Sequence, residues 1–338
     1  MRPEGLSRLL IVVSVAGIVA CGSQPSARQP AARTCSPLHV AAKPMTLAPS
    51  DQPTTGFALP TGTQPVGIIR DGDGASVWLL GTGSNTVYHV MPGGQASAYV
   101  LPFSELGIQL SQAPDGTVWA PEQYRNAVAA IGRDGAVREC LLPGKDREPV
   151  ATSAAADGSV WITEARGSAI AHLVGDKFSE YPIGQAGVRG GEVLADPAGG
   201  AWFTVMGAPV LGHVSDSGEV QLTPIGGSGT YLGVIQAADG AVWVADFNGD
   251  SVIRVAPGGA LTEWKAQAGS KPQGLAFDSG GVLWVTESNA NWIARVHGST
   301  LERVLGTGQW PDHVTITSDG HAWFTEYYSD RVGRVTVP

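Results

Sequence analysis

The sequence has 338 residues, of which 43% are apolar and 15% charged, so the chain can bury a large core. Its 46 glycines and 23 prolines argue against a helical protein, because both residues destabilise helix interiors. The formal net charge of −9 excludes binding to nucleic acid, which requires a positively charged surface.

Residues 1–20 are predicted to be a signal peptide. Arg2 and Arg8 flank the start of an apolar run, Leu9–Val19, that is too short to span a bilayer as a permanent helix. The tetrapeptide Ile18–Cys21 has the pattern of a bacterial lipobox, in which the cysteine thiol receives a diacylglycerol. Two acyl chains suffice for stable attachment, so we expect a protein outside the cytoplasm, anchored to the cell membrane by a lipidated Cys21. The alternative is an ordinary secretion signal whose cysteine is incidental.

Residues 21–55 are predicted to be a flexible stalk. Residues 22–42 are rich in Ser, Gln, Pro, Ala and Arg and have few large apolar side chains for a core. Cys35 in this stretch and Cys140 further along are the cysteines that remain if Cys21 is lipidated. An oxidising compartment permits a bridge between them, and two unpaired thiols are the alternative.

A tryptophan recurs at almost constant spacing from residue 78 onward. Gly and Asp precede each one, an apolar residue follows, and Thr-Glu often comes next. The successive gaps are 41, 42, 41, 41, 41 and 39 residues, which is the period of a propeller blade. The seven positions are Trp78, Trp119, Trp161, Trp202, Trp243, Trp284 and Trp323.

Each repeat contains short strands separated by turns and no stretch of helical periodicity. In the sixth repeat the predicted strands are 274–277, 282–287, 292–296 and 301–305. Four antiparallel strands per repeat predict an all-β fold, a seven-bladed β-propeller over residues 56–338. The seventh repeat ends after its third strand, and Gly56–Pro60 resembles the missing fourth. We therefore expect this N-terminal strand to close the ring, which leaves no free sheet edge there.

Carboxylates recur three residues after the repeat tryptophan, at the end of the second strand. This end faces the side of the propeller that carries the loops between blades, called the top face below. Together the carboxylates could hold a hard cation through oxygen ligands. The alternative, which we favour, is that each accepts backbone hydrogen bonds from its own loop. The positions are Glu122, Glu164, Asp246, Glu287 and Glu326.

The last repeat departs from the pattern at Trp310–His313, where His313 takes the place of a glycine in the sequence Pro-x-Gly. An imidazole there is a candidate base, and Asp312 and Glu326 would orient it. Glu287 and Glu326 are the candidate metal ligands. Nearby aromatic residues are candidate walls of an apolar pocket, or else pack between blades: Trp292, Trp310, Tyr327 and Tyr328.

The repeats resemble the virginiamycin B lyase family in the segments Trp323–Glu326, Ile131–Arg133 and Val332–Arg334. The resemblance spans residues 56–338. It implies seven blades and a top-face site where a glutamate-bound magnesium ion assists a histidine base in opening a cyclic depsipeptide by elimination at its ester. The family's two histidine positions fall on Gln273 and Asp312, and its first glutamate falls on Trp310. Glu326 matches the second glutamate, and His313 lies one residue from an expected histidine.

We therefore expect a monomeric envelope lipoprotein that binds a small molecule or an envelope protein on its top face. Gln273, Trp310, Tyr327 and Trp292 are the predicted ligand contacts. The alternative is a metal-assisted carbon–oxygen lyase, acting on a streptogramin-like depsipeptide or lactone with Mg²⁺ as cofactor. A sugar or lactone hydrolase is a third option, by analogy with other propellers.

Overall fold

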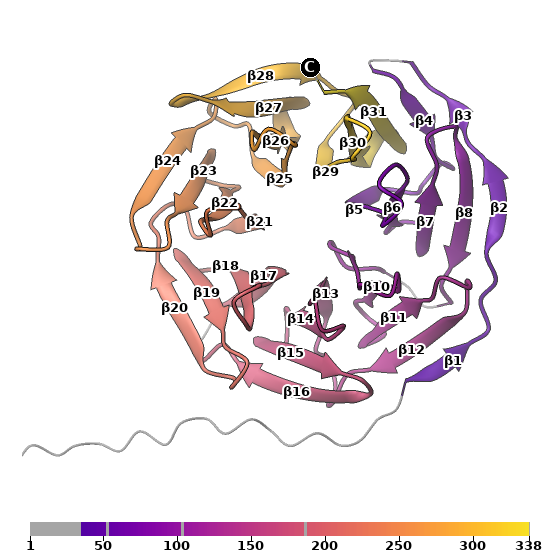
Figure 1. Ribbon diagram of the computed structural model, residues 1–338, viewed down its shortest axis with the longest axis horizontal. Helices are drawn as coiled ribbons and strands as arrows, with labels where there is room; N and C mark the ends of the chain where they lie inside the picture. The colour runs from indigo at the N-terminus through magenta and orange to yellow at the C-terminus, as the bar shows by residue number, and fades with distance from the viewer. Residues whose placement is uncertain (1–34, 52–53, 103–104, 186–187, 338) are drawn as a thin grey trace, which may run out of the picture.

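The computed structural model describes residues 35–51, 54–102, 105–185 and 188–337. The predicted signal peptide and Cys21 lie outside the described residues. The described chain forms seven antiparallel sheets arranged around a central axis, each with its first strand innermost (Figure 1). The prediction of a seven-bladed β-propeller is confirmed. Helical structure in this part of the chain is limited to two single 3₁₀ turns, η1 (Ser288–Ala290) and η2 (Tyr327–Ser329).

The first three blades follow one another along the chain, and each contributes its four strands in order from the axis outward. Blade 1 contains β5 (Pro65–Arg70), β6 (Val77–Gly81), β7 (Thr86–Val90) and β8 (Gln95–Val100). Blade 2 contains β9 (Ser111–Gln112), β10 (Val118–Glu122), β11 (Ala127–Ile131) and β12 (Val137–Leu141). Blade 3 contains β13 (Pro149–Ala154), β14 (Val160–Glu164), β15 (Ala169–Val174) and β16 (Lys177–Pro182).

Blades 4 to 6 repeat this arrangement, and blade 7 takes three strands from the C-terminal end of the chain. Blade 4 contains β17 (Arg189–Ala195), β18 (Ala201–Met206), β19 (Val210–Val214) and β20 (Val220–Pro224). Blade 5 contains β21 (Tyr231–Gln236), β22 (Val242–Asp246), β23 (Ser251–Val255) and β24 (Leu261–Lys265). Blade 6 contains β25 (Pro272–Phe277), β26 (Leu283–Glu287), β27 (Trp292–His297) and β28 (Thr300–Gly306). Blade 7 contains β29 (Pro311–Ile316), β30 (His321–Glu326) and β31 (Arg331–Thr336).

The ring closes through β4 (Gly56–Ala58), which pairs antiparallel with β31 as the fourth strand of blade 7. Phe57 on β4 stacks on Trp323, with ring centroids 6.0 Å apart. The buried side chains of Leu47 and Leu59 join Trp323 and blade 1 in one hydrophobic cluster. The pairing of β4 with β31 confirms the predicted closure of the ring. Burial of each of these apolar side chains contributes roughly 1.5–3 kcal/mol to the stability of the closed ring.

The prediction of a flexible stalk over residues 21–55 is wrong for residues 36–49. These residues form three strands along the outside of the ring: β1 (Ser36–Leu38) on blade 2, β2 (Lys43–Thr46) on blade 1 and β3 (Ala48–Pro49) on blade 7 (Figure 1). We call residues 35–51 the N-terminal belt. A disulfide between Cys35 and Cys140 fixes its beginning to blade 2, so the bridged alternative holds. The main chain of the belt pairs with existing edge strands, so few apolar side chains suffice to order it.

In blades 1, 3, 4, 5 and 7 the repeat tryptophan packs against the residue opposite it on the third strand. That residue is a histidine in blades 1, 3 and 4 and an arginine in blades 5, 6 and 7. Blade 2 has Ala130 there, and Arg138 of the fourth strand lies over Trp119 instead. The repeat is therefore maintained by stacking of an indole with a cationic or imidazole side chain.

Candidate functional site

The innermost strands approach the axis closely, which restricts the side chains that fit there. We compare one equivalent position on the seven innermost strands. It lies two residues before the residue that pairs with the repeat tryptophan. A Cβ atom at Gly67 would overlap the carbonyl oxygen of Ile108, and one at Gly233 would overlap that of Gln273. Three blades nevertheless carry a large polar side chain at this position. In blade order it is occupied by Gly67, Gln109, Ala151, Glu192, Gly233, Gly274 and His313.

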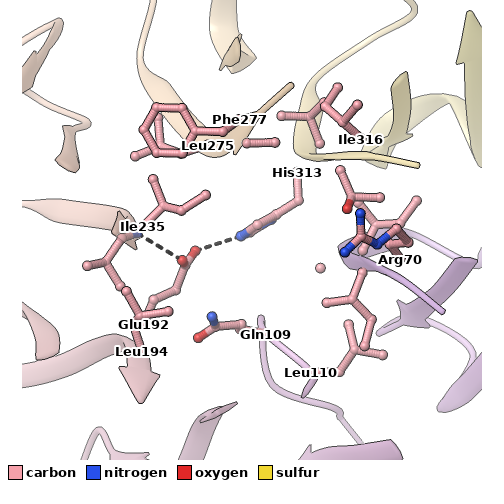
Figure 2. Close-up of a pocket in the computed structure, with 17 residues that line it drawn as sticks. Arg70, Gln109, Leu110, Glu192, Leu194, Ile235, Leu275, Phe277, His313 and Ile316 are labelled. Carbon is pink, nitrogen blue, oxygen red and sulfur yellow. Dashed lines mark hydrogen bonds and ion pairs between the residues drawn. The ribbon is translucent and has the colours of Figure 1, made fainter. Parts of the chain in front are cut away.

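His313 and Glu192 meet across the axis, although they lie 121 residues apart in the sequence (Figure 2). His313 Nε2 donates to Glu192 Oε1 at 2.6 Å, and Nδ1 donates to the carboxylate of Asp312. The other oxygen of Glu192 accepts the backbone N–H of Val234 on blade 5, at 3.2 Å. All three side chains are buried, so this ion triad joins blades 4, 5 and 7 near the axis.

The imidazole of His313 is positively charged in this setting. Burial disfavours the charged ring, but the charges of Glu192 and Asp312 outweigh burial and raise the pKa of His313 to about 10. Both ring nitrogens carry a proton and both donate to a carboxylate, so the ring has no free lone pair.

Gln273 extends the triad into blade 6. Its Nε2 group donates to the second oxygen of Asp312 at 2.7 Å, and its Oε1 atom lies 3.2 Å from the hydroxyl of Ser288. That hydroxyl also lies 2.7 Å from the carbonyl oxygen of Pro311. The two positions where the sequence resemblance implies histidines are thus filled by a hydrogen-bonded glutamine–aspartate pair.

Glu287 and Glu326 make no hydrogen bond or ion pair with His313 or Asp312 in the described structure, and each pairs with an arginine of its own blade instead. Glu287 lies 2.5 Å from Arg303 Nε on the outer strand of its blade. Glu326 lies 2.5 Å from Arg331 Nη1 and accepts the backbone N–H of Gly308 at 2.8 Å. Both carboxylates are fully buried, and an arginine already neutralises each one.

The other repeat carboxylates also lie against their own blades rather than in a shared ring. Asp246 accepts the backbone N–H of Ser228 at 2.8 Å and that of Gly249 at 3.1 Å. The alternative in which each carboxylate binds its own loop is therefore confirmed for Asp246 and Glu326. Glu122 and Glu164 are buried without a hydrogen-bond partner in the part of the chain described.

The residues at this end of the propeller do not fit a magnesium ion. Mg²⁺ requires carboxylate oxygens free to coordinate it, whereas Glu287 and Glu326 are engaged by arginines and Trp310 occupies the family's first glutamate position. Among the described residues, the one group of three His, Cys, Asp or Glu side chains with ligand spacing lies in blade 1, at Asp71, Asp73 and His89. It surrounds the hydroxyl of Ser76 beside the stacked pair of His89 and Trp78, which makes it part of the repeat packing.

Aromatic side chains gather where blade 7 begins. Trp310 has a left-handed backbone with φ of 60°, an unusual conformation for a bulky residue. It is held by hydrogen bonds of its N–H to Asn291 Oδ1 at 2.8 Å and of its carbonyl to the N–H of Tyr327 at 2.9 Å. The Trp310 ring meets Tyr328 edge-on at 5.7 Å and lies 6.4 Å from Phe247. The same left-handed conformation occurs at Gln64, Glu148 and Lys271, each directly before a blade-opening proline, so it belongs to the repeat.

Tyr327 lines a hollow of about 470 Å³ on the top face, between blades 1, 2 and 7. Its other polar walls come from the loops between blades and from the turns between second and third strands: Gln64, Asn85, Glu105 and Gln123. Trp292, the remaining predicted ligand contact, lies beneath the guanidinium of Arg303 in blade 6 and is 36% exposed.

Glu192 is the site residue that sequence reasoning missed. The sequence did contain an indication: Glu192 in blade 4 replaces the glycine found at this position in other blades, as His313 does in blade 7. The doubled glycines before it, Gly190 and Gly191, obscured the register, which shifts at a bulge in this strand.

The fold and the axial cluster define a seven-bladed propeller with a polar centre near its top face, and the comparisons name its family. Residues 47–230 and 221–338 match the Virginiamycin B lyase family, and the chain belongs to that family. Virginiamycin B lyase from Nocardia farcinica (strain IFM 10152) is 32% identical over 193 residues, which cover 56% of this chain and 67% of that protein.

Two solved structures show the shared fold. A streptogramin B lyase structure superposes with a TM-score of 0.78 at 22% identity, covering 82% of this chain and 95% of that one. A catalytically inactive histidine-to-alanine variant of virginiamycin B lyase from Staphylococcus aureus, solved with quinupristin, superposes with a TM-score of 0.77 at 23% identity. It covers 88% of this chain and all of that one.

Proposed function

We propose that this chain is a ligand-binding member of the virginiamycin B lyase family that holds a small organic molecule on its top face without opening it. The observation that carries the proposal is the state of His313, charged and locked between Glu192 and Asp312. The positions at which relatives are expected to carry histidines hold Gln273 and Asp312, which are bonded to each other.

Elimination at an ester requires a neutral base within reach of the substrate proton. With a pKa of about 10, roughly one His313 ring in a thousand is neutral at pH 7. Deprotonation of His313 would also leave the buried carboxylates of Glu192 and Asp312 without a positive charge between them, which is unfavourable. Because the carboxylates nearby do not fit magnesium, no step is assigned to a metal.

The hollow beside Tyr327 and the aromatic group around Trp310 suit an apolar cyclic ligand. Tyr328 is 61% exposed and Trp310 is half-buried, so both rings offer surface to a bound molecule. One solved relative contains quinupristin, which makes a cyclic depsipeptide the first ligand class to test.

The proposed location is the outer side of the cell membrane, with Cys21 as the lipid anchor. The disulfide between Cys35 and Cys140 supports an oxidising compartment. None of the described helices has the length and apolar character needed to cross a membrane. Metabolic labelling with a palmitate analogue should mark the wild type and leave Cys21→Ala unlabelled; equal labelling of the two would contradict the anchor.

The binding role is tested by titrating quinupristin into the protein in a calorimeter and following ring opening by mass spectrometry, with and without Mg²⁺. We expect saturable binding, no ring opening in either buffer, and about tenfold weaker binding by Trp310→Ala. Leu261→Ala is the control, since Leu261 is a 48% exposed apolar residue on the outer strand of blade 5 and does not line the hollow. Ring opening that disappears in His313→Ala would establish the lyase alternative, and no binding at all would remove this ligand class.

A further inference from the structure

A second cavity lies on the propeller axis, and it shares no lining residue with the hollow beside Tyr327. Its volume is about 360 Å³, within the range of small-molecule sites. The pair formed by Glu192 and His313 lies at its wall, and the innermost strands enclose the rest (Figure 2).

About half of the cavity surface is apolar, and this half forms a continuous part of the wall from blades 4 to 7. Its side chains come from blades 4 to 7 and are each only half-buried in the described structure, although they pack against the cores between blades. Water inside such a wall finds few hydrogen-bond partners, so an apolar molecule displaces it favourably. The residues concerned are Leu194, Ile235, Leu275, Phe277 and Ile316.

Arg70, the last residue of β5, supplies a positive charge at this cavity (Figure 2). Its guanidinium has no hydrogen bond or ion pair to any described residue, whereas His313 on the opposite wall already pairs with Glu192 and Asp312, and this triad keeps one net negative charge. A guanidinium provides paired donors that match a carboxylate.

We propose that the axial cavity binds an apolar molecule bearing one carboxylate, with the carboxylate on Arg70 and the apolar body against the walls from blades 4 to 7. A medium-chain fatty acid of about ten non-hydrogen atoms matches the size and chemistry of the cavity. The opposite arrangement, an apolar amine, would place a positive charge beside Arg70 and is disfavoured.

Octanoate is the probe, titrated calorimetrically into the full-length protein, with 1-octanol as its uncharged counterpart. We expect Arg70→Gln to weaken octanoate binding about tenfold and to leave octanol binding unchanged. Arg133→Gln is the matched control: Arg133 is also exposed, and it does not line the cavity. It should bind octanoate as the wild type does.

Ile235→Trp fills the cavity and should abolish binding of both probes, provided that its circular dichroism and melting match the wild type. If it fails to fold, the Arg70→Gln comparison decides alone. Absence of saturable octanoate binding by the wild type, or equal affinity in Arg70→Gln, would overturn the proposal. Quinupristin binding measured on the same variants should not change, which separates this cavity from the top-face ligand site.

Discussion

Blades 2 and 7 hold the two ends of the N-terminal belt, and they do so by different chemistry. In blade 7 the repeat carboxylate Glu326 pairs with Arg331, whose other amino group donates to the carbonyls of Ser50 and Thr54 at 2.8 and 2.6 Å. In blade 2 the hold is covalent, through Cys35 and Cys140.

The equivalent carboxylate of blade 2, Glu122, has no hydrogen-bond partner in the described structure. Burial and the nearby charge of Glu139 raise the pKa of Glu122 to about 8 despite the opposing charge of Arg125. The same repeat position therefore carries a carboxylate that pairs with a belt-binding arginine in one blade, and a neutral acid in another. The repeat fixes where the carboxylate lies, and the neighbouring strand decides its charge.

The largest effect is expected from Arg331→Met. It leaves Glu326 buried without a counter-charge and frees the belt carbonyls, so the free energy of unfolding should fall by about 3–5 kcal/mol. Urea denaturation followed by tryptophan fluorescence measures it. Lys265→Met is the control, because its pair with Glu263 is exposed and should contribute about 1 kcal/mol or less. A loss in Arg331→Met no larger than in Lys265→Met would remove the distinction between the two blades.

Replacing both Cys35 and Cys140 by serine should lower the free energy of unfolding by about 2–4 kcal/mol, because the bridge closes a loop of 105 residues in the unfolded chain. The same denaturation experiment on the reduced wild type should give a similar loss. Unchanged stability in the double variant would mean that β-pairing alone holds the belt on blade 2.

The last prediction concerns the pH dependence of stability in Glu122→Gln. The folded pKa of Glu122 is raised above that of the unfolded chain, so wild-type stability from this group is complete below about pH 4.5 and falls as pH rises to about 8. In Glu122→Gln this loss of unfolding free energy, about 1.4 kcal/mol per pH unit, should be absent. The variant should therefore be more stable than the wild type at pH 8. Denaturation midpoints between pH 5 and pH 8 test this, with the exposed Glu219→Gln as control. Parallel pH profiles for Glu122→Gln and the wild type would show that Glu122 is charged in the folded protein.

The sequence predicted the ring and its closure because both depend on local patterns. The repeat tryptophans mark the second strand of every blade, and Gly56–Pro60 resembles the outer strands of other repeats while the last repeat lacks its own. The belt escaped prediction because Ser36–Leu38 and Lys43–Thr46 have little apolar character. Their order comes from backbone pairing with distant strands and from one disulfide.

The candidate site was predicted in part for a similar reason. His313 and Asp312 are neighbours in the chain, and their contact follows directly. Glu192 lies on the opposite side of the axis, so only an alignment of all seven innermost strands would have placed it there. Arg303 and Arg331 form the ion pairs with Glu287 and Glu326. Both arginines lie on other strands, at positions that the tryptophan repeat does not mark.

The belt also divides the perimeter of the molecule into two unequal sectors. Blades 7, 1 and 2 have their outer strands covered by β3, β2 and β1, whereas blades 3 to 6 end on β16, β20, β24 and β28. Charged residues interrupt three of these four free edges, and β20 carries none and closes with Pro224. The free edges of blades 7, 1 and 2 are thus the short strands β3, β2 and β1, and among the four longer edges blade 4 has the one least guarded by charge.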